Sequence, residues 1–248
     1  GGTCGPPGDG GERDEDEAGE HGPPLYGFPM SPMRWIDLAH PYDEAMTHIP
    51  AGGPPCIRNI FDIERDPYNL QELRLVSHLG THVDAPMHFI KGGRTIDTYA
   101  LDDLGGEGWV LPIARGPNEA ITVKDLEASG AEVERGQIVL LATGWDLKFS
   151  TPEYHTHPYL SDEASRWLLD HGVKMVGVDF FSADLPVPRR PKGFDWPVHH
   201  LLLGNGILIA ENLANLTAVA GRRLTIGAFP LKIKGGDGAP ARIFAIDA

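Results

Sequence analysis

The stretch Ser77-His-Leu-Gly-Thr-His-Val-Asp-Ala-Pro-Met-His-Phe89 places three histidines and an aspartate within eleven residues: His78, His82, Asp84 and His88. Imidazole and carboxylate groups are the ligands that zinc, manganese and other borderline divalent cations prefer. A single histidine is more often a surface or core residue, but four such groups spaced around a glycine and a proline are typical of a metal site. We therefore predict that this segment binds a divalent cation.

The spacing of these residues sets a condition on the backbone. A straight strand rises about 3.3 Å per residue, so His78 and Asp84 would lie roughly 20 Å apart. That is too far for one ion whose bonds measure about 2.0–2.3 Å. In a helix, residues six positions apart point in different directions, and Pro86 removes a backbone donor. The segment must turn back on itself, and we expect it to bend at Gly80 and Pro86.

Helical and strand patterns alternate along the middle of the chain. Thr122–Gly130 and Ser161–Gly172 each begin with a hydroxyl side chain near acidic residues and end at a glycine. This pattern predicts two short helices. The apolar runs at residues 137–143 and 173–178 follow them and predict buried strands. Helices alternating with buried strands are typical of an α/β fold.

The beginning of the chain has a different composition. Residues 1–29 consist mainly of glycine, proline and acidic residues, and we predict that they form a disordered extension. The apolar stretch Arg34–Leu38 is the expected first strand. No internal repeat or second boundary follows it, so we predict one α/β domain with a mixed sheet over residues 30–248.

The C-terminal residues are typical of an antiparallel hairpin. Thr225–Lys234 and Ala241–Ile246 are rich in branched and aromatic side chains, as strands are. The glycine-rich residues 235–240 between them predict a loose loop.

Charge and composition exclude several partners. The formal net charge of −14 argues against nucleic acid, because phosphate binding requires a basic surface. No apolar run approaches the ~20 residues of a membrane span, so we expect no membrane partner. The chain has only two cysteines, too few for a disulfide scaffold, and this fits a cytoplasmic protein.

Two further candidates lie far from the first cluster. Asp195-Trp-Pro-Val-His199 is typical of a helix start, with the proline in the first turn. One of His199 and His200 should point inward, but the residues alone leave open which. Glu211 ends the apolar run Ile207–Ala210 and is expected at a strand end, where a carboxylate is either solvated or functional.

The pattern His-x-Gly-Thr-His-x-Asp-Ala-Pro-x-His at residues 78–88 resembles the signature of the cyclase-type metal-dependent hydrolases, which include bacterial kynurenine formamidases and isatin hydrolases. Residues 139–146, 176–179 and 199–213 resemble later blocks of that family, in the same order. The resemblance extends from about Trp35 to near the C-terminus. It implies the swivelling β/β/α cyclase fold and a homodimer or homotetramer.

The resemblance also implies a ligand set for Zn²⁺ or Mn²⁺, with one or two ions per subunit. By position, His78, His82 and Asp84 would bind a first ion, and Asp84 could bridge to a second. His199 matches a ligand of the second ion, and Glu211 matches a carboxylate that can contact both.

The reaction we predict is hydrolysis of a C–N amide bond, a formamide or cyclic amide, in a small and aromatic molecule. A metal ion lowers the pKa of a bound water from about 15.7 toward about 7 and stabilises the developing oxyanion. His88 matches the proton-transferring histidine of the family and is the predicted catalytic residue. Formamidases often carry an aromatic residue where this chain has Ile49-Pro50, which weakens the case for N-formylkynurenine as substrate.

A different reaction class fits part of the pattern. His82, Asp84 and His199 could form the two-histidine, one-carboxylate triad of non-haem iron oxygenases. Oxygenases of the 2-oxoglutarate type carry an arginine shortly after the distal histidine, and residues 207–213 contain none. The triad also leaves His78 and His88 without a role. A closed structural zinc site is excluded, because such sites are rich in cysteine.

The remaining patterns are less specific. His155-Thr-His157 is flanked by prolines, and we expect it in an exposed loop. Four aromatic residues next to the family blocks could line an apolar pocket or belong to the core: Phe89, Trp145, Phe180 and Phe181.

Overall fold

The apolar run Ile138–Ala142 forms strand β7, and all five of its residues are buried in the computed structural model, which describes residues 33–49 and 52–247. Alternate side chains of β7 enter two different hydrophobic cores. Ile138, Leu140 and Ala142 belong to one core, and Val139 and Leu141 belong to the other. A strand that is buried on both faces requires a continuous apolar run, so the predicted buried strand is confirmed.

Seven further strands complete the main sheet: β1 (Arg34–Asp37), β4 (His82–Asp84), β5 (Gly105–Pro112), β9 (Met175–Val178), β10 (Leu208–Glu211), β11 (Arg223–Pro230) and β12 (Gly238–Asp247). The strand order is β1-β12-β11-β5-β7-β9-β10-β4, and β4 also pairs with β12. The strands from β4 to β12 therefore close into a barrel-like sheet of seven strands, with β1 outside the ring. Strands β5, β7, β9 and β10 run parallel, and the other pairs are antiparallel.

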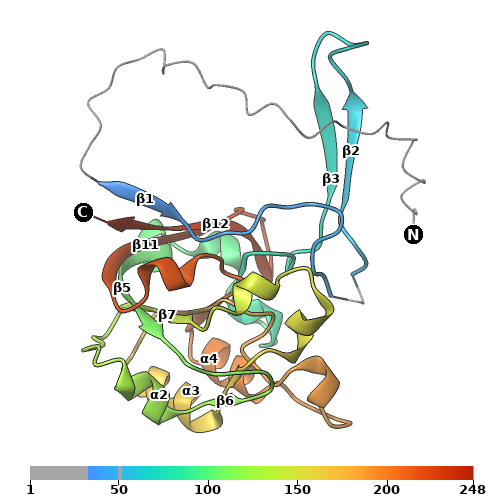
Figure 1. Ribbon diagram of the computed structural model, residues 1–248. Coiled ribbons are helices and arrows are strands. Elements are labelled where there is room, and N and C mark those ends of the chain that lie inside the picture. The colour runs from blue at the N-terminus through green and yellow to red at the C-terminus, as the bar shows by residue number, and fades with distance from the viewer. Residues whose placement is uncertain (1–32, 50–51, 248) are drawn as a thin grey trace. The chain divides into compact units, whose positions relative to one another are not determined.

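Helices cover the parallel strands on the outside of this ring. The described residues contain four α-helices: α1 (Leu101–Leu104), α2 (Val123–Ala128), α3 (Asp162–Asp170) and α4 (Pro197–Gly204). Helices α2, α3 and α4 lie together on one side of the sheet (Figure 1), where they contribute to the second core. The expected capping residues are present, because Ser161 Oγ accepts a hydrogen bond from the Ala164 N–H and Thr122 belongs to a capping box. Both helices predicted from these caps are confirmed.

Within the part of the chain that the structure describes, six short 3₁₀ helices connect the larger elements: η1 (Pro86–His88), η2 (Ile96–Thr98), η3 (Trp145–Lys148), η4 (Pro152–Thr156), η5 (Val187–Arg189) and η6 (Leu216–Val219). We predicted an exposed loop around residues 155–157, and this prediction is wrong. The side chain of His157 is completely buried, because it stacks on Phe180 with ring centroids 5.5 Å apart and donates from Nδ1 to the Pro158 carbonyl at 2.8 Å.

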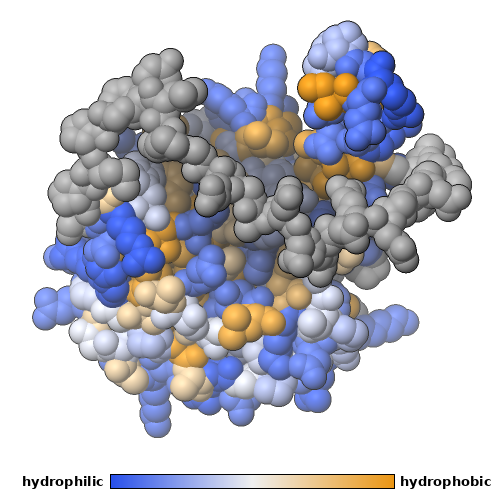
Figure 2. All heavy atoms as spheres, turned by 45° about the horizontal axis from the view of Figure 1, so that its top comes forward, coloured by the Kyte–Doolittle hydropathy of each residue, from blue (hydrophilic) through white to orange (hydrophobic). Residues whose placement is uncertain are grey.

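Two small sheets accompany the barrel. Strands β6 (Ala120–Ile121) and β8 (Tyr159–Leu160) form a parallel pair. Strands β2 (Cys56–Phe61) and β3 (Leu70–Arg74) form a hairpin that projects away from the main sheet (Figure 1). All five residues of β3 are exposed. The space-filling view shows apolar surface on this hairpin and near its base (Figure 2).

The C-terminal hairpin is present with different bounds. Strand β11 ends at Pro230, and β12 already begins at Gly238, so the loop spans residues 231–237 rather than 235–240. The difference arises because Gly238, Ala239 and Pro240 pair with strand β4 and close the barrel. A pairing partner so distant in sequence leaves no local pattern.

Residues 1–29, for which we predicted a disordered extension, lie outside the described residues. Among the helices that the structure describes, none has the length and apolar character needed to cross a membrane.

Candidate metal centre

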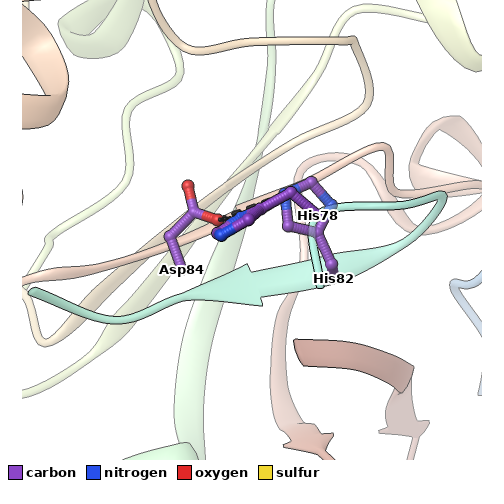
Figure 3. Close-up of side chains that lie close together, drawn as sticks. All are labelled: His78, His82 and Asp84. Carbon is purple, nitrogen blue, oxygen red and sulfur yellow. Dashed lines mark hydrogen bonds and ion pairs between the residues drawn. The ribbon is translucent and has the colours of Figure 1, made fainter. Parts of the chain in front are cut away.

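A turn at Gly80 brings the first three candidate ligands together. Gly80 has a φ of +55°, a left-handed conformation that favours glycine, and a Cβ at this position would lie 2.5 Å from the terminal methyl of Met46. Strand β4 follows and presents His82 and Asp84 on one face, because they are two residues apart. Asp84 Oδ1 lies 2.5 Å from His78 Nδ1 and 3.2 Å from His82 Nε2 (Figure 3). The predicted bend at Gly80 is confirmed.

The neighbouring strand β10 and helix α4 add the two distal candidates. Strand β10 pairs with β4 in a register that places Glu211 opposite His82. Glu211 is 6% exposed, so it is not a solvated strand end. His199, in the first turn of α4, has its Nε2 3.3 Å from Glu211 Oε1 and 3.5 Å from Asp84 Oδ2. The structure therefore brings all five predicted ligands together.

The choice between the adjacent histidines is also decided by the geometry. His199 is buried and belongs to the cluster, whereas His200 is exposed. The ring of His200 contacts Phe89 instead, with centroids 5.3 Å apart.

Each of the three clustered histidines has its second ring nitrogen held by an oxygen acceptor. His82 Nδ1 lies 2.8 Å from the Gly80 carbonyl oxygen. His199 Nδ1 lies 2.5 Å from Asp184 Oδ2, and His78 Nε2 lies 3.0 Å from Asp237 Oδ2. Outer acceptors of this kind fix the ring orientation and the tautomer of metal-binding histidines. The remaining nitrogen of each ring faces the carboxylates of the cluster.

The residues fit a divalent cation by their own chemistry. Asp84 Oδ2 is buried and has no hydrogen-bond partner among the described residues. A buried carboxylate oxygen without a donor is costly unless a cation neutralises it. Asp84 belongs to two groups of possible ligands. In one group it joins His78 and His82, and in the other it joins His199 and Glu211. Within each group the ligand atoms all lie within 4.8 Å of one another. The arrangement can hold two ions with Asp84 as the bridge.

Neighbouring carboxylates raise the pKa of two histidines in this cluster, His78 and His199. Burial alone would lower the pKa of His78, but Asp84 and Asp237 outweigh it and raise the pKa to about 10. Burial also opposes the charged form of His199, yet hydrogen bonds to carboxylates, Asp184 first, hold its pKa well above the usual range. The carboxylates therefore favour the positively charged form of His78 and His199, and a bound cation would satisfy the same carboxylates.

His88 lies beside the cluster, and its pKa is lowered where those of His78 and His199 are raised. It ends the 3₁₀ helix η1, which begins at Pro86, so the chain does bend at the second predicted position. The His88 ring stacks on His78 with centroids 3.7 Å apart. Its Nδ1 lies 3.4 Å from Asp237 Oδ2, and burial lowers its pKa. His88, His78 and Asp237 form a further group with possible ligand atoms within 4.8 Å.

A cavity of about 120 Å³ opens onto the centre. Its apolar wall contains Ile49, Phe89, Phe181 and Trp196, and its polar wall includes Arg190. This volume is below the ~150 Å³ of a cavity that holds one benzene ring, so it limits the enclosed part of a ligand to a single ring at most.

Of the four aromatic residues considered from the sequence, Phe89 and Phe181 line this cavity, whereas Trp145 and Phe180 are buried in the second core. A larger cavity of about 500 Å³ lies between the β2–β3 hairpin and β12. None of the candidate metal groups lines it, so we place the chemistry at the smaller cavity.

Sequence reasoning missed the two outer carboxylates. Asp237 lies between two glycines in the β11–β12 loop, 159 residues from His78. Asp184 lies 15 residues before His199 and also accepts hydrogen bonds from the backbone N–H groups of Val198 and His199. Their only signal in the sequence is an acidic residue in a loop, which is too common to single them out.

Comparison with known proteins agrees with this geometry. The model of the cyclase family, described as "Putative cyclase", matches residues 36–185. The chain belongs to the cyclase family. The kynurenine formamidase of Salinibacter ruber is 36% identical over 180 residues, which cover 73% of this chain and 81% of that protein. The kynurenine formamidase of Geobacillus thermodenitrificans is 29% identical over 210 residues, with 84% and 95% covered.

Solved structures of the cyclase family share the fold. Isatin hydrolase A from Ralstonia solanacearum superposes with a TM-score of 0.77 at 25% identity and covers 87% of this chain and 92% of its own. A protein from Bacillus stearothermophilus described as a "predicted metal-dependent hydrolase" gives a TM-score of 0.72 at 28% identity, with 88% of this chain and 100% of its own covered. The predicted mixed-sheet cyclase fold is confirmed.

These relatives also decide the reaction class. This cyclase-family chain is a metal-dependent hydrolase that acts on C–N bonds other than peptide bonds, as predicted. The iron oxygenase alternative receives no support from them.

Proposed function

We propose that the chain hydrolyses a formamide or cyclic amide of a small aromatic molecule at the Asp84 centre. Its ligands for one or two Zn²⁺ or Mn²⁺ ions are His78, His82, Asp84, His199 and Glu211. The observation that carries the proposal is the buried Asp84 Oδ2, which makes no hydrogen bond to the described residues and lies between two groups of ligand atoms. Relatives named kynurenine formamidase and isatin hydrolase support the substrate class.

The bound cations would supply Lewis acidity, which polarises the amide carbonyl and acidifies a water molecule. The protein contributes orientation, because the outer acceptors on His78, His82 and His199 fix the rings before any substrate arrives. Phe89 and Trp196 give the cavity an apolar wall, which would limit the access of bulk water and strengthen electrostatic interactions beside it.

His88 moves the proton in this mechanism. Its Nδ1 faces Asp237 Oδ2, and its Nε2 makes no hydrogen bond to any described residue. Nε2 is therefore the atom that would take a proton from the attacking water and pass it to the leaving nitrogen. Asp237 holds the ring from the other side and stabilises the charged imidazole during the transfer.

Metal analysis of purified variants tests the ligand set. His82→Ala and Asp84→Ala should each lower the metal content and abolish hydrolysis, because water cannot replace one of three or four ligands without loss of affinity. Chelation of the wild-type protein should have the same effect, reversed by Zn²⁺ or Mn²⁺. His200→Ala is the matched control, since His200 lies outside the cluster. Full metal occupancy in both ligand variants would refute the site.

The substrate is tested by a screen of formylanilides, cyclic imides and lactones with metal-reconstituted protein. Hydrolysis of the amides and imides is expected. Activity confined to lactones would contradict the assignment of a C–N bond.

We also propose that residues 30–248 form the catalytic domain and that it acts in the cytoplasm as a homodimer or homotetramer. The family match from residue 36 supports the domain boundary. The exposed apolar side chains of the β2–β3 hairpin support self-association.

A further inference from the structure

One cationic side chain in the wall of the cavity has no role in the mechanism above. Arg190 follows the 3₁₀ helix η5 and lines the same cavity as the metal cluster. Its Nε donates to the Leu185 carbonyl at 2.7 Å, and its Nη2 donates to Ser182 Oγ at 3.3 Å. Among the described residues, Nη1 has no acceptor, and no carboxylate lies within ion-pair distance of the guanidinium.

The absence of a counterion is unusual for a side chain in this position. Arg190 is partly buried, and burial lowers its pKa, although Asp184 and Glu211 partly oppose the shift. A guanidinium nevertheless stays charged in proteins. A partly buried charge without a partner does not favour folding, so the position needs another explanation.

The surroundings hold the guanidinium in place. The Arg190 guanidinium lies 5.3 Å from the ring centroid of Phe194 and 5.4 Å from that of Trp196. Trp196 itself lines the cavity and is the N-cap of α4. A planar cation fixed by ring contacts and two hydrogen bonds loses little entropy when it binds an anion. Its remaining N–H groups match the geometry of a carboxylate.

We infer that Arg190 binds an acidic group on the substrate, so that the preferred substrates are aromatic amides with a carboxylate on the ring. The inference rests on the proposed amide hydrolysis at the same site. The small volume of the cavity requires the acid group and the scissile amide to be close neighbours on one ring, because Arg190 and the metal ligands line the same space.

Two other roles for Arg190 predict different kinetics. If Arg190 stabilised the developing oxyanion, its removal would slow the hydrolysis of charged and neutral amides alike. If it only held the loop after η5, its removal would lower stability and affect all substrates equally. Only binding of a substrate anion changes the preference between the two kinds of substrate.

A matched pair of substrates makes this distinction: 2-formamidobenzoate carries the acid group, and formanilide lacks it. The quantity measured is the ratio of kcat/KM for the two compounds with the metal-loaded enzyme. We expect Arg190→Gln to lower this ratio about 10- to 100-fold, mainly through KM, which is the effect of losing a charge-assisted hydrogen bond. Arg190→Lys should show a smaller loss, since it keeps the charge but not the planar fork.

Arg189→Gln is the control, because Arg189 is the preceding residue, is exposed and does not line the cavity. Its ratio should equal that of the wild type. An unchanged ratio in both Arg190 variants, or equal losses for both substrates, would overturn the inference. Thermal melting of each variant checks folding, and the lysine variant decides the matter if the glutamine variant does not fold.

Binding of benzoate to the metal-loaded proteins separates this inference from the proposed function. Any contact of benzoate with the cations is common to wild type and variants, so the difference in Kd reports Arg190. A Kd raised about tenfold or more in Arg190→Gln supports the anion site even if neither amide is hydrolysed, in which case only the proposed function fails. An equal Kd in wild type and variant overturns the anion site.

Discussion

Asp84 connects the two groups of candidate ligands, because its two carboxylate oxygens face different histidines. Oδ1 approaches His78 and His82 from its own segment, and Oδ2 approaches His199. Burial would raise the pKa of Asp84, but the charges of His78 and His82 hold it well below the usual range. The bridging role that we propose for Asp84 depends both on His78 and His82 from its own segment and on His199 from helix α4.

His88 should be separable from the ligands by mutation. We expect His88→Ala to retain its metal and lose about 10²- to 10⁴-fold in kcat, because the role we propose for this residue is proton transfer rather than metal binding. The pH–rate profile should lose the change in rate that accompanies protonation of His88. Metal analysis and kcat on the same preparation check the prediction, and a metal-free variant would show that His88 is a ligand.

Glu211→Gln distinguishes a ligand from a strand-end residue. Glutamine keeps the shape and can still accept the hydrogen bond that the Ala183 N–H donates to Glu211 Oε1 at 2.8 Å. The fold should survive, while metal stoichiometry and turnover fall because the negative charge is lost. A surface carboxylate would change the free energy of unfolding by no more than about 0.5 kcal/mol and leave the metal in place. Native metal content with native hydrolysis would exclude Glu211 from the site.

At the scale of single residues, the sequence alone predicted the candidate ligands that lie close together in the chain. His78, His82 and Asp84 lie within one segment, so composition and spacing sufficed to find them. His199 and Glu211 needed the family resemblance, since their contacts to Asp84 depend on the strand order. Asp184, Asp237 and Arg190 were not predicted, because each acts through a contact that only the folded chain creates.

At the scale of elements, helix α4 is positioned by a carboxylate from outside it. Asp184 accepts hydrogen bonds from the backbone N–H groups of Val198 and His199 and from the His199 ring. It thus satisfies donors at the helix start, where the N-cap residue Trp196 provides no side-chain acceptor. The same contact orients the distal ligand, so the stability of the helix and the geometry of the site are coupled.

Asp184→Asn should lower both the stability of the fold around helix α4 and the affinity of the site for metal. The substitution removes the charge and turns one acceptor into a donor, so we expect a loss of about 1.5–3 kcal/mol in the free energy of unfolding. Metal affinity should fall about 10- to 100-fold, as it does when an outer partner of a ligating histidine is lost. Urea unfolding and metal titration measure the two effects. Asp195→Asn, at an exposed residue just before the N-cap, is the control. Equal results for the two variants would contradict the coupling.

The elements also show where pattern reading reached its limit. The helices at 123–128 and 162–170 and the strands at 138–142 and 175–178 carry caps and apolar runs, and they form as predicted. The β2–β3 hairpin was missed because its side chains are mostly exposed, so no alternation of buried and exposed residues marks it. The loop before β12 was placed too late, because the pairing with β4 is not visible in the sequence.

At the scale of the whole molecule, closure of the barrel creates the site. Strand β4 pairs with β10 on one side and β12 on the other. The first pairing brings Glu211 to His82, and the second places Gly238 against the His78 ring, where a Cβ would lie 2.6 Å from His78 Cε1. The candidate ligands therefore come together only when the sheet closes into the barrel.

The β2–β3 hairpin remains outside this closed unit. A two-stranded hairpin is marginally stable in water by itself. Here it exposes five large apolar side chains, each between 42% and 64% accessible: Ile60, Ile63, Tyr68, Leu70 and Leu73. Figure 2 shows this apolar surface on the hairpin. Exposed apolar surface of this kind is typical of protein–protein interfaces, and a second copy of the chain is the partner we propose.

Charged substitutions on the hairpin test that assembly. Leu70→Glu and Leu73→Glu should leave the fold intact, because both side chains are exposed, but each should weaken self-association at least tenfold. Burying one leucine contributes about 1.5–3 kcal/mol, and a carboxylate in the same place would oppose association. Sedimentation velocity over a range of concentrations should show a shift toward monomer. Leu147→Glu is the control, since Leu147 is 83% exposed and belongs to η3 rather than to the hairpin. A wild-type protein that is monomeric at every concentration would refute the assembly. Hairpin variants that sediment like the control would place the interface on another surface.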